Sequence, residues 1–145
     1  MNSFRKEYDV LADSIVTNAA VIDATSVIDG EQIPNYVYTE RAAWDTGAQF
    51  TFISPRIVES LGLIPSGKAW YMGIGGDQES YTYKVHVALP NGKLVRNVNA
   101  YCTDIDDYDL LLGMDIIVLT DFLITNKDSK TTFQFRAPAE GGVEL

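Results

Sequence analysis

Apolar and polar residues alternate along much of the chain with the two-residue period of half-buried β-strands. The alternation is clearest over Tyr81–Leu89, where Tyr81, Tyr83, Val85, Val87 and Leu89 share one face and His86 falls on the opposite, solvent-facing side. Turn-forming sequences, Asp29-Gly30 and Pro90–Lys93, punctuate the pattern. Strands are predicted over Ala20–Ile28, Ile33–Trp44, Tyr81–Leu89, Leu94–Tyr101 and Thr131–Arg136.

Two short helices interrupt these strands. Ser54 is a good N-cap, Pro55 suits the first helical position, and Gly62 can end a helix over Arg56–Leu61. A second helix is predicted around Asp115–Asp121, after Gly113. The predicted fold is therefore mostly β, a closed or partly closed antiparallel β-barrel with two short α-helices. Residues 1–14 are predicted to form a polar N-terminal arm, and residues 15–145 a single domain.

Charge and composition exclude several classes of function. The 145 residues carry 11 basic and 20 acidic side chains, a net charge of −9, which argues against binding to nucleic acid. One cysteine cannot form an internal disulfide, and one histidine rules out a His-rich metal site, so we expect no metal and no cofactor. No apolar run is long enough for a leader or a membrane span, and we expect a cytoplasmic protein without membrane contact.

One segment, Ala42–Ser54, contains the candidate chemistry. Asp45-Thr46-Gly47-Ala48 follows the end of an apolar strand, and an alternating Phe50, Phe52 strand and the capped helix come after it. An Asp-x-Gly tripeptide alone is usually an ordinary turn. In this context, however, the turn would hold a carboxylate where backbone amides can approach it and tune its proton affinity.

Two glycine-containing segments accompany it. Asp109–Ile117 places three leucines before Gly113, which predicts a buried strand that turns sharply into a helix. Tyr71–Asp77 has three glycines in four positions and predicts a mobile loop or hairpin tip. The latter is no phosphate-binding loop, because Gly-Lys-Ser/Thr does not follow, and Gln78 breaks a dinucleotide fingerprint.

Taken in order, these residues resemble the retropepsin-like (retroviral-type) aspartic proteases, over about residues 33–135. Asp-Thr-Gly-Ala at 45–48, with a hydroxyl at Thr51, resembles the active-site loop of that family. The Met72–Gly76 stretch is placed like its flap. Leu-Leu-Leu-Gly at 110–113 resembles the segment that threads behind the active-site loop, and Gly-Met-Asp at 113–115 is typical of cellular and bacterial members.

The resemblance implies roles for individual residues. Asp45 would be the catalytic carboxylate, Thr46 would brace the two active-site loops of a dimer, and Gly47 would contact the substrate backbone. Two residues depart from the family: Trp44 stands where a smaller aliphatic residue is usual, and Gln49 stands where many viral members have an acidic residue. These departures bear on the substrate preference more than on the chemistry of cleavage. The implied substrate-binding residues are Ala48, Gln49, Gly73, Ile74, Gly75 and Gly76.

Aspartic protease chemistry needs two carboxylates that share a proton, and this chain holds one Asp-Thr-Gly. We therefore expect a C2 homodimer in which each chain supplies Asp45, acting as an endopeptidase on an extended peptide with water as nucleophile. The alternative is a catalytically idle domain of the same fold that dimerises or binds peptides. The intact motif favours the enzyme.

Two other features of the sequence have simpler interpretations. The acidic cluster Asp104–Asp109 lacks the central glycine and terminal glutamate of a calcium loop, so a solvated loop is expected. Cys102 and His86 could form a nucleophilic pair, but nothing around them supports it, and an inert buried cysteine is commoner.

Overall fold

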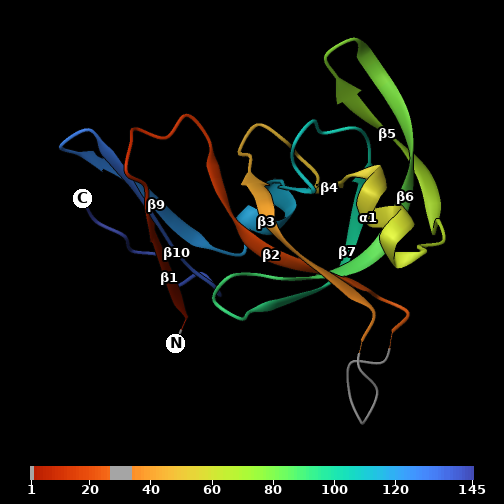
Figure 1. Cartoon of the computed structure of the whole chain (residues 1–145), viewed down its shortest axis with the longest axis horizontal. Helices are drawn as coiled ribbons and strands as arrows, with labels where there is room; N and C mark the ends of the chain where they lie inside the picture. Colours follow the sequence, from red (N-terminus) through yellow and green to blue (C-terminus); the bar gives the residue numbers. More distant parts are fainter. Residues whose placement is uncertain (1, 27–33) are drawn as a thin grey trace.

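The computed structural model describes residues 2–26 and 34–145, and the predicted Asp29-Gly30 turn lies outside these ranges. Strands dominate the described chain, with two short helices between them (Figure 1). The elements are β1 (Ser3–Glu7), β2 (Ile15–Asp23), β3 (Tyr36–Trp44), β4 (Phe52–Ile53), α1 (Pro55–Leu61), β5 (Gly67–Gly73), β6 (Gly76–Ala88), β7 (Leu94–Cys102), β8 (Leu110–Leu112), α2 (Met114–Ile117), β9 (Asp121–Lys127) and β10 (Lys130–Arg136).

The strands form two sheets. A three-stranded sheet, in the order β1-β10-β9, unites the two ends of the chain and is called here the terminal sheet. A seven-stranded sheet has the order β2-β3-β8-β4-β7-β6-β5, and β2 also pairs with β6, so the pairings form a circuit. In Figure 1 the terminal sheet lies on the left and the β5–β6 hairpin projects at the upper right.

The prediction of a mostly β chain with two short helices is confirmed, but the expected antiparallel arrangement holds only in part, because the seven-stranded sheet is mixed. β3 runs parallel to β8, and β4 runs parallel to β7. The parallel pairing of β3 with β8 carries Trp44 and Leu112 to the same end of the sheet. The loops that follow these strands therefore start side by side, and this places the Asp45 loop beside the turn at Gly113. Alternation within a strand carries no information about the direction of its neighbour.

The first helix has the predicted ends, and the second is shorter than predicted. The Ser54 side chain accepts a hydrogen bond from the Ile57 N–H, and Gly62 ends α1 in the left-handed conformation with φ 61°. The prediction of a helix to Asp121 is wrong, because α2 ends at Ile117. The Thr120 hydroxyl donates to the Ile117 carbonyl at 2.8 Å, and this turn starts β9.

His86 is buried, which corrects the prediction of a solvent-facing side chain. The ladder of β6 and β7 shifts register between Val85 and Val87, so His86 turns inward as well. Its Nδ1 accepts a hydrogen bond from the Asn97 N–H at 2.9 Å. Burial, and next the charge of Arg96, lower the pKa of His86, so the ring is neutral at pH 7.

The side chain of Asp109 is buried, although the acidic segment Asp104–Asp109 was predicted to be a solvated loop. It accepts hydrogen bonds from the Thr39 hydroxyl at 2.7 Å and from the guanidinium groups of Arg41 and Arg56. Burial by itself raises the pKa of Asp109, but the bonds from Thr39, Arg56 and Arg41 outweigh burial and lower it. Asp109 thus joins β3, α1 and the start of β8. Among the described residues, no group of three or more side chains is placed to hold a metal ion.

We expect Asp109→Asn to lower the free energy of unfolding at pH 7 by about 2 kcal/mol, less than for a fully buried pair because both arginines are half exposed. The pKa of Asp109 is lower in the folded protein than in the unfolded chain. The stabilisation is therefore complete above the unfolded-state pKa of about 3.9, and it is lost as the pH falls through the pKa of Asp109 in the folded protein. Denaturant unfolding of the wild type and the variant at pH 7 and pH 3 measures this difference in the free energy of unfolding. The exposed Asp107→Asn is the control, and a deficit equal at both pH values would contradict this assignment.

The core accommodates Trp44, the large residue next to Asp45. Its ring packs against Phe122, Phe133 and Phe135 of the terminal sheet, and its Nε1–H donates to the Thr17 hydroxyl at 2.9 Å. The terminal sheet therefore supports the strand that ends just before Asp45.

Within the predicted polar arm, β1 pairs with β10, so this segment is part of the terminal sheet. Neither described helix is long and apolar enough to cross a membrane.

Candidate active site

Asp45 is the first residue after β3, at the start of the loop Asp45–Thr51. Its N–H donates to the Leu112 carbonyl at 2.9 Å, which fixes the loop to the end of β8. The residue is half-buried, and its Oδ1 accepts a hydrogen bond from the Gly47 N–H at 2.8 Å. A Cβ at Gly47 would lie 3.1 Å from the same oxygen. The loop therefore presents a carboxylate that a backbone amide orients, as predicted.

The segment that begins at Gly113 passes directly behind this loop. The Met114 and Asp115 N–H groups donate to the carbonyls of Ala48 and Gln49, at 2.7 and 3.2 Å. A Cβ at Gly113 would lie 2.3 Å from the Phe50 carbonyl oxygen, so only glycine allows this approach. The buried strand that turns into a helix is thus confirmed, and its turn is the support of the Asp45 loop.

Thr51 and Asp115 hold the other end of the loop. The Thr51 hydroxyl donates to Asp115 Oδ1 at 2.7 Å, and the Thr51 N–H donates to Oδ2 at 3.0 Å. The Gly113 N–H in turn donates to the Thr51 hydroxyl oxygen at 3.3 Å. Thr51 is fully buried, so these bonds are shielded from water. From the sequence, Thr51 is expected in the active-site loop, whereas Asp115 is predicted only as the start of a helix.

The glycine-rich segment forms the tip of the β5–β6 hairpin. Gly73 pairs with Gly76, Gly76 has φ 110°, and Ile74 and Gly75 make the turn between them. The Ile74 side chain is fully exposed. The predicted hairpin tip is therefore confirmed. In Figure 1 the tip stands clear of the rest of the chain.

An open cavity of about 620 Å³ lies beside Asp45. Of the predicted residues, Asp45, Gly47, Ala48 and Gln49 line it, whereas Thr46 and Gly73–Gly76 do not. Asp45 is the only acidic side chain in the lining that the described residues provide. The remaining walls are Phe50, Phe52, Tyr71, Met72, Thr103, Ile105 and Leu111.

Aromatic rings give this cavity one of its walls. Phe50 stacks on Tyr101 with ring centroids 4.8 Å apart, and Tyr71 meets Phe52 edge-on at 4.9 Å. Tyr71 thereby connects the β5–β6 hairpin to the wall of the cavity. Thr103 and Ile105 were not predicted, because they reach the site only through the parallel pairing of β4 with β7.

Comparison with known families agrees with this geometry. A family model described as aspartyl protease matches residues 17–116, more than half of the chain. The chain belongs to the aspartyl protease family. The matched range includes the Asp45 loop, the hairpin and the Gly113 turn of this aspartyl protease. The resemblance drawn from its motifs is confirmed, and the protein is a hydrolase of the protease class.

Solved structures include one similar to this aspartyl protease, the crystal structure of a retropepsin-like aspartic protease from Rickettsia conorii. The two chains are 14% identical and superpose with a TM-score of 0.49; the match covers 94% of this chain and 97% of the other. No curated protein shows significant similarity to the chain.

Proposed function

We propose that this protein is an aspartic endopeptidase that works as a homodimer, with Asp45 of each chain forming the catalytic pair. The observation that supports this most strongly is that the cavity beside the oriented carboxylate of Asp45 has no other acidic group among its described lining residues. A second carboxylate must come from elsewhere, and a C2 axis beside Asp45 supplies an identical one. Thr46, exposed at the same loop, is available to bridge the two copies.

Two carboxylates held a few ångströms apart cannot both ionise easily, so the pair retains one proton over a wide pH range. The ionised Asp45 acts as general base and removes a proton from water, which attacks the peptide carbonyl carbon. The protonated Asp45 of the other subunit donates its proton to the carbonyl oxygen, which gives a tetrahedral diol. When the diol collapses, the C–N bond breaks, the leaving amine takes the proton that the first carboxylate removed from water, and a diol hydroxyl returns its proton to the second carboxylate. The Gly47 N–H bond to Oδ1 keeps one carboxylate oxygen oriented during this exchange.

The substrate that this cavity suits is an extended peptide. A peptide backbone can pair with exposed backbone groups of the Asp45 loop and the Gly73–Gly76 tip, while its side chains enter the adjacent cavity. Aromatic and aliphatic walls, with Phe50, Phe52 and Leu111 among them, favour apolar side chains. Ala48, Gln49 and Ile74 are the proposed contacts at the two sides of the peptide.

Cleavage of a library of end-blocked peptides at mildly acidic pH tests the proposal, since only an endopeptidase cleaves inside a chain with both ends blocked. We expect specific activity to fall on dilution in parallel with the dimer fraction measured by sedimentation, and a statine-type transition-state mimic to inhibit. Full activity in a sedimenting monomer would overturn the dimeric mechanism. A stable dimer that binds the mimic without cleaving any peptide would favour the idle peptide-binding domain.

A further inference from the structure

Phe50 is a wall of two cavities, the one beside Asp45 and a second one of about 340 Å³. A third cavity, of about 330 Å³, adjoins the second, because Val95, Arg96 and Leu119 line both. The second and third cavities together are called here the Arg96 groove. The Arg96 groove therefore adjoins the proposed substrate cavity at Phe50.

The walls of the Arg96 groove are mainly apolar, and its exposed charges are basic. Most of the lining is aliphatic or aromatic, and Leu119 within it is 46% exposed. Lys93 and Arg96 are both exposed. The one acidic residue in the described lining, Asp115, already accepts hydrogen bonds from Thr51 on both of its carboxylate oxygens. The groove therefore offers an apolar surface beside positive charge.

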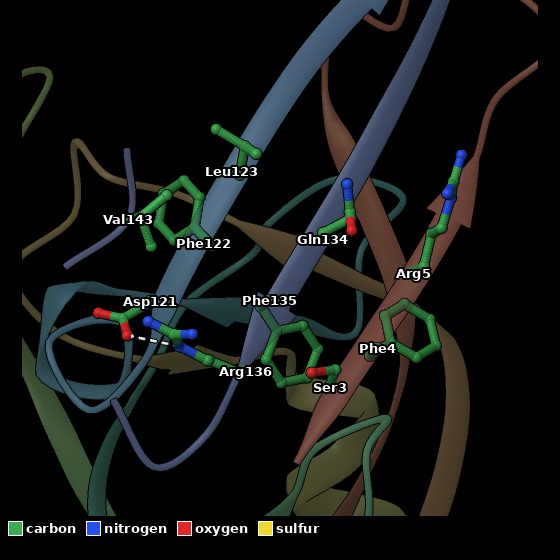
Figure 2. Close-up of a pocket in the computed structure, with 10 residues that line it drawn as sticks. All are labelled: Ser3, Phe4, Arg5, Asp121, Phe122, Leu123, Gln134, Phe135, Arg136 and Val143. Atoms are coloured by element: carbon green, nitrogen blue, oxygen red, sulfur yellow. Dashed lines mark hydrogen bonds and ion pairs between the residues drawn. The ribbon is translucent and has the colours of Figure 1, made fainter. Parts of the chain in front are cut away.

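Arg96 differs from the other four arginines of the chain. Each of the others forms an ion pair with a carboxylate, namely Arg5, Arg41, Arg56 and Arg136. Figure 2 shows the pair of Arg136 with Asp121, in a cavity of about 280 Å³. Within residues 2–26 and 34–145, no carboxylate pairs with Arg96. An unpaired guanidinium beside an apolar surface suits a carboxylate from outside the chain.

We propose that the Arg96 groove binds a part of the protein substrate that lies beyond the cleaved region and carries an acidic residue beside an apolar one. The acidic residue pairs with Arg96, and the apolar one covers Leu119. The net charge of −9 disfavours acidic segments at the surface as a whole, so an electropositive groove selects where such a segment binds. This inference rests on the proposed function and adds a second determinant of substrate choice to the cavity beside Asp45.

In the proposed dimer, both ends of the substrate have access to a groove. The two-fold axis beside Asp45 repeats the Arg96 groove on the partner subunit. A peptide that crosses this axis therefore has one copy of the groove beyond each of its ends. An acidic residue on either side of the cleaved bond can accordingly pair with an arginine.

End-blocked peptides that share one cleavable sequence and differ in an extension test the proposal. An aspartate is moved residue by residue along the extension and compared at each position with asparagine, its neutral isostere. The assay is run above the ordinary pKa of aspartate, about 3.9, so that the carboxylate is ionised. We expect aspartate to raise kcat/KM about fivefold at the position that reaches Arg96, which is the upper range for an exposed ion pair. Added salt should reduce this preference.

Variants of Arg96 give the decisive comparison. Each preference is a ratio of kcat/KM values within one enzyme, so it does not depend on how much of that enzyme is folded. Arg96→Gln should abolish the preference for aspartate over asparagine, and Arg96→Glu should reverse it and favour lysine at the same position. Lys130→Gln, at an exposed lysine outside the groove, is the control and should keep the wild-type preference.

The outcomes separate this inference from the proposed function. Equal cleavage of the aspartate and asparagine peptides at every position would overturn the groove and leave the endopeptidase standing. A preference for aspartate that persists in Arg96→Glu would also overturn it. If Arg96→Glu prevents the dimer from forming in sedimentation, the groove is a contact between copies, and its assignment to the substrate is wrong. A failure to cleave any peptide, extended or not, would instead count against the proposed function itself.

Discussion

Asp45→Asn is expected to lower kcat for peptide cleavage at least about a thousandfold, within the range of about a hundredfold to ten-thousandfold that a general acid–base group contributes. Asparagine preserves the size of the side chain and can still accept the hydrogen bond from the Gly47 N–H, so fold and dimerisation should not change. The loss then reports the proton transfers alone. Cleavage of an end-blocked peptide, with unfolding and sedimentation in parallel, measures the three properties separately.

Mixing this variant with the wild type gives a sharper result. If subunits exchange freely, equal amounts yield about a quarter wild-type homodimers, and mixed dimers carry only one carboxylate. Activity should therefore fall to about a quarter of that of the undiluted wild type. An exposed Asp107→Asn subunit, mixed in the same way, should cause no loss. A decrease to one half would mean that each Asp45 works independently, which contradicts a shared catalytic pair.

Much of the architecture around Asp45 follows from local sequence. The caps of α1 at Ser54 and Gly62 depend on neighbouring residues only, and the sequence predicts both. The hairpin tip at Gly73–Gly76 follows from three glycines between two strand patterns. The Asp45 loop and the Gly113 turn are recognisable because their order along the chain matches a family, and the family match over residues 17–116 confirms that inference.

Features that depend on contacts distant in sequence could not be predicted. His86 follows the alternation of its strand, yet a register shift against β7 turns it inward, where Asn97 donates to it. Asp109 belongs to an acidic run, and only folding places Arg41 and Arg56 around it. Asp115 reaches Thr51 across 64 residues of sequence. In each case a partner from another element satisfies the side chain, and His86 and Asp109 are buried as a result.

Gly113→Ala is expected to lower the free energy of unfolding by about 3 kcal/mol, the upper range for adding one methyl group to a tightly packed site. The backbone at Gly113 has φ −90°, which alanine adopts without strain, so the effect is steric alone. The new Cβ would lie 2.3 Å from the Phe50 carbonyl oxygen and 3.0 Å from that of Ala48. These are backbone atoms, and they can yield only if the Asp45 loop moves.

Activity should therefore fall together with stability, because the segment that must move carries the catalytic carboxylate. Gly67→Ala is the matched control: its Cβ would meet only the Thr82 hydroxyl, at an ordinary 3.4 Å. Denaturant unfolding and kcat/KM of both variants, measured at a temperature where each is folded, separate the two effects. A Gly113→Ala protein that is folded but catalytically impaired identifies the turn behind the loop as a support of Asp45. Wild-type stability and activity in that variant would refute the close packing of the two segments.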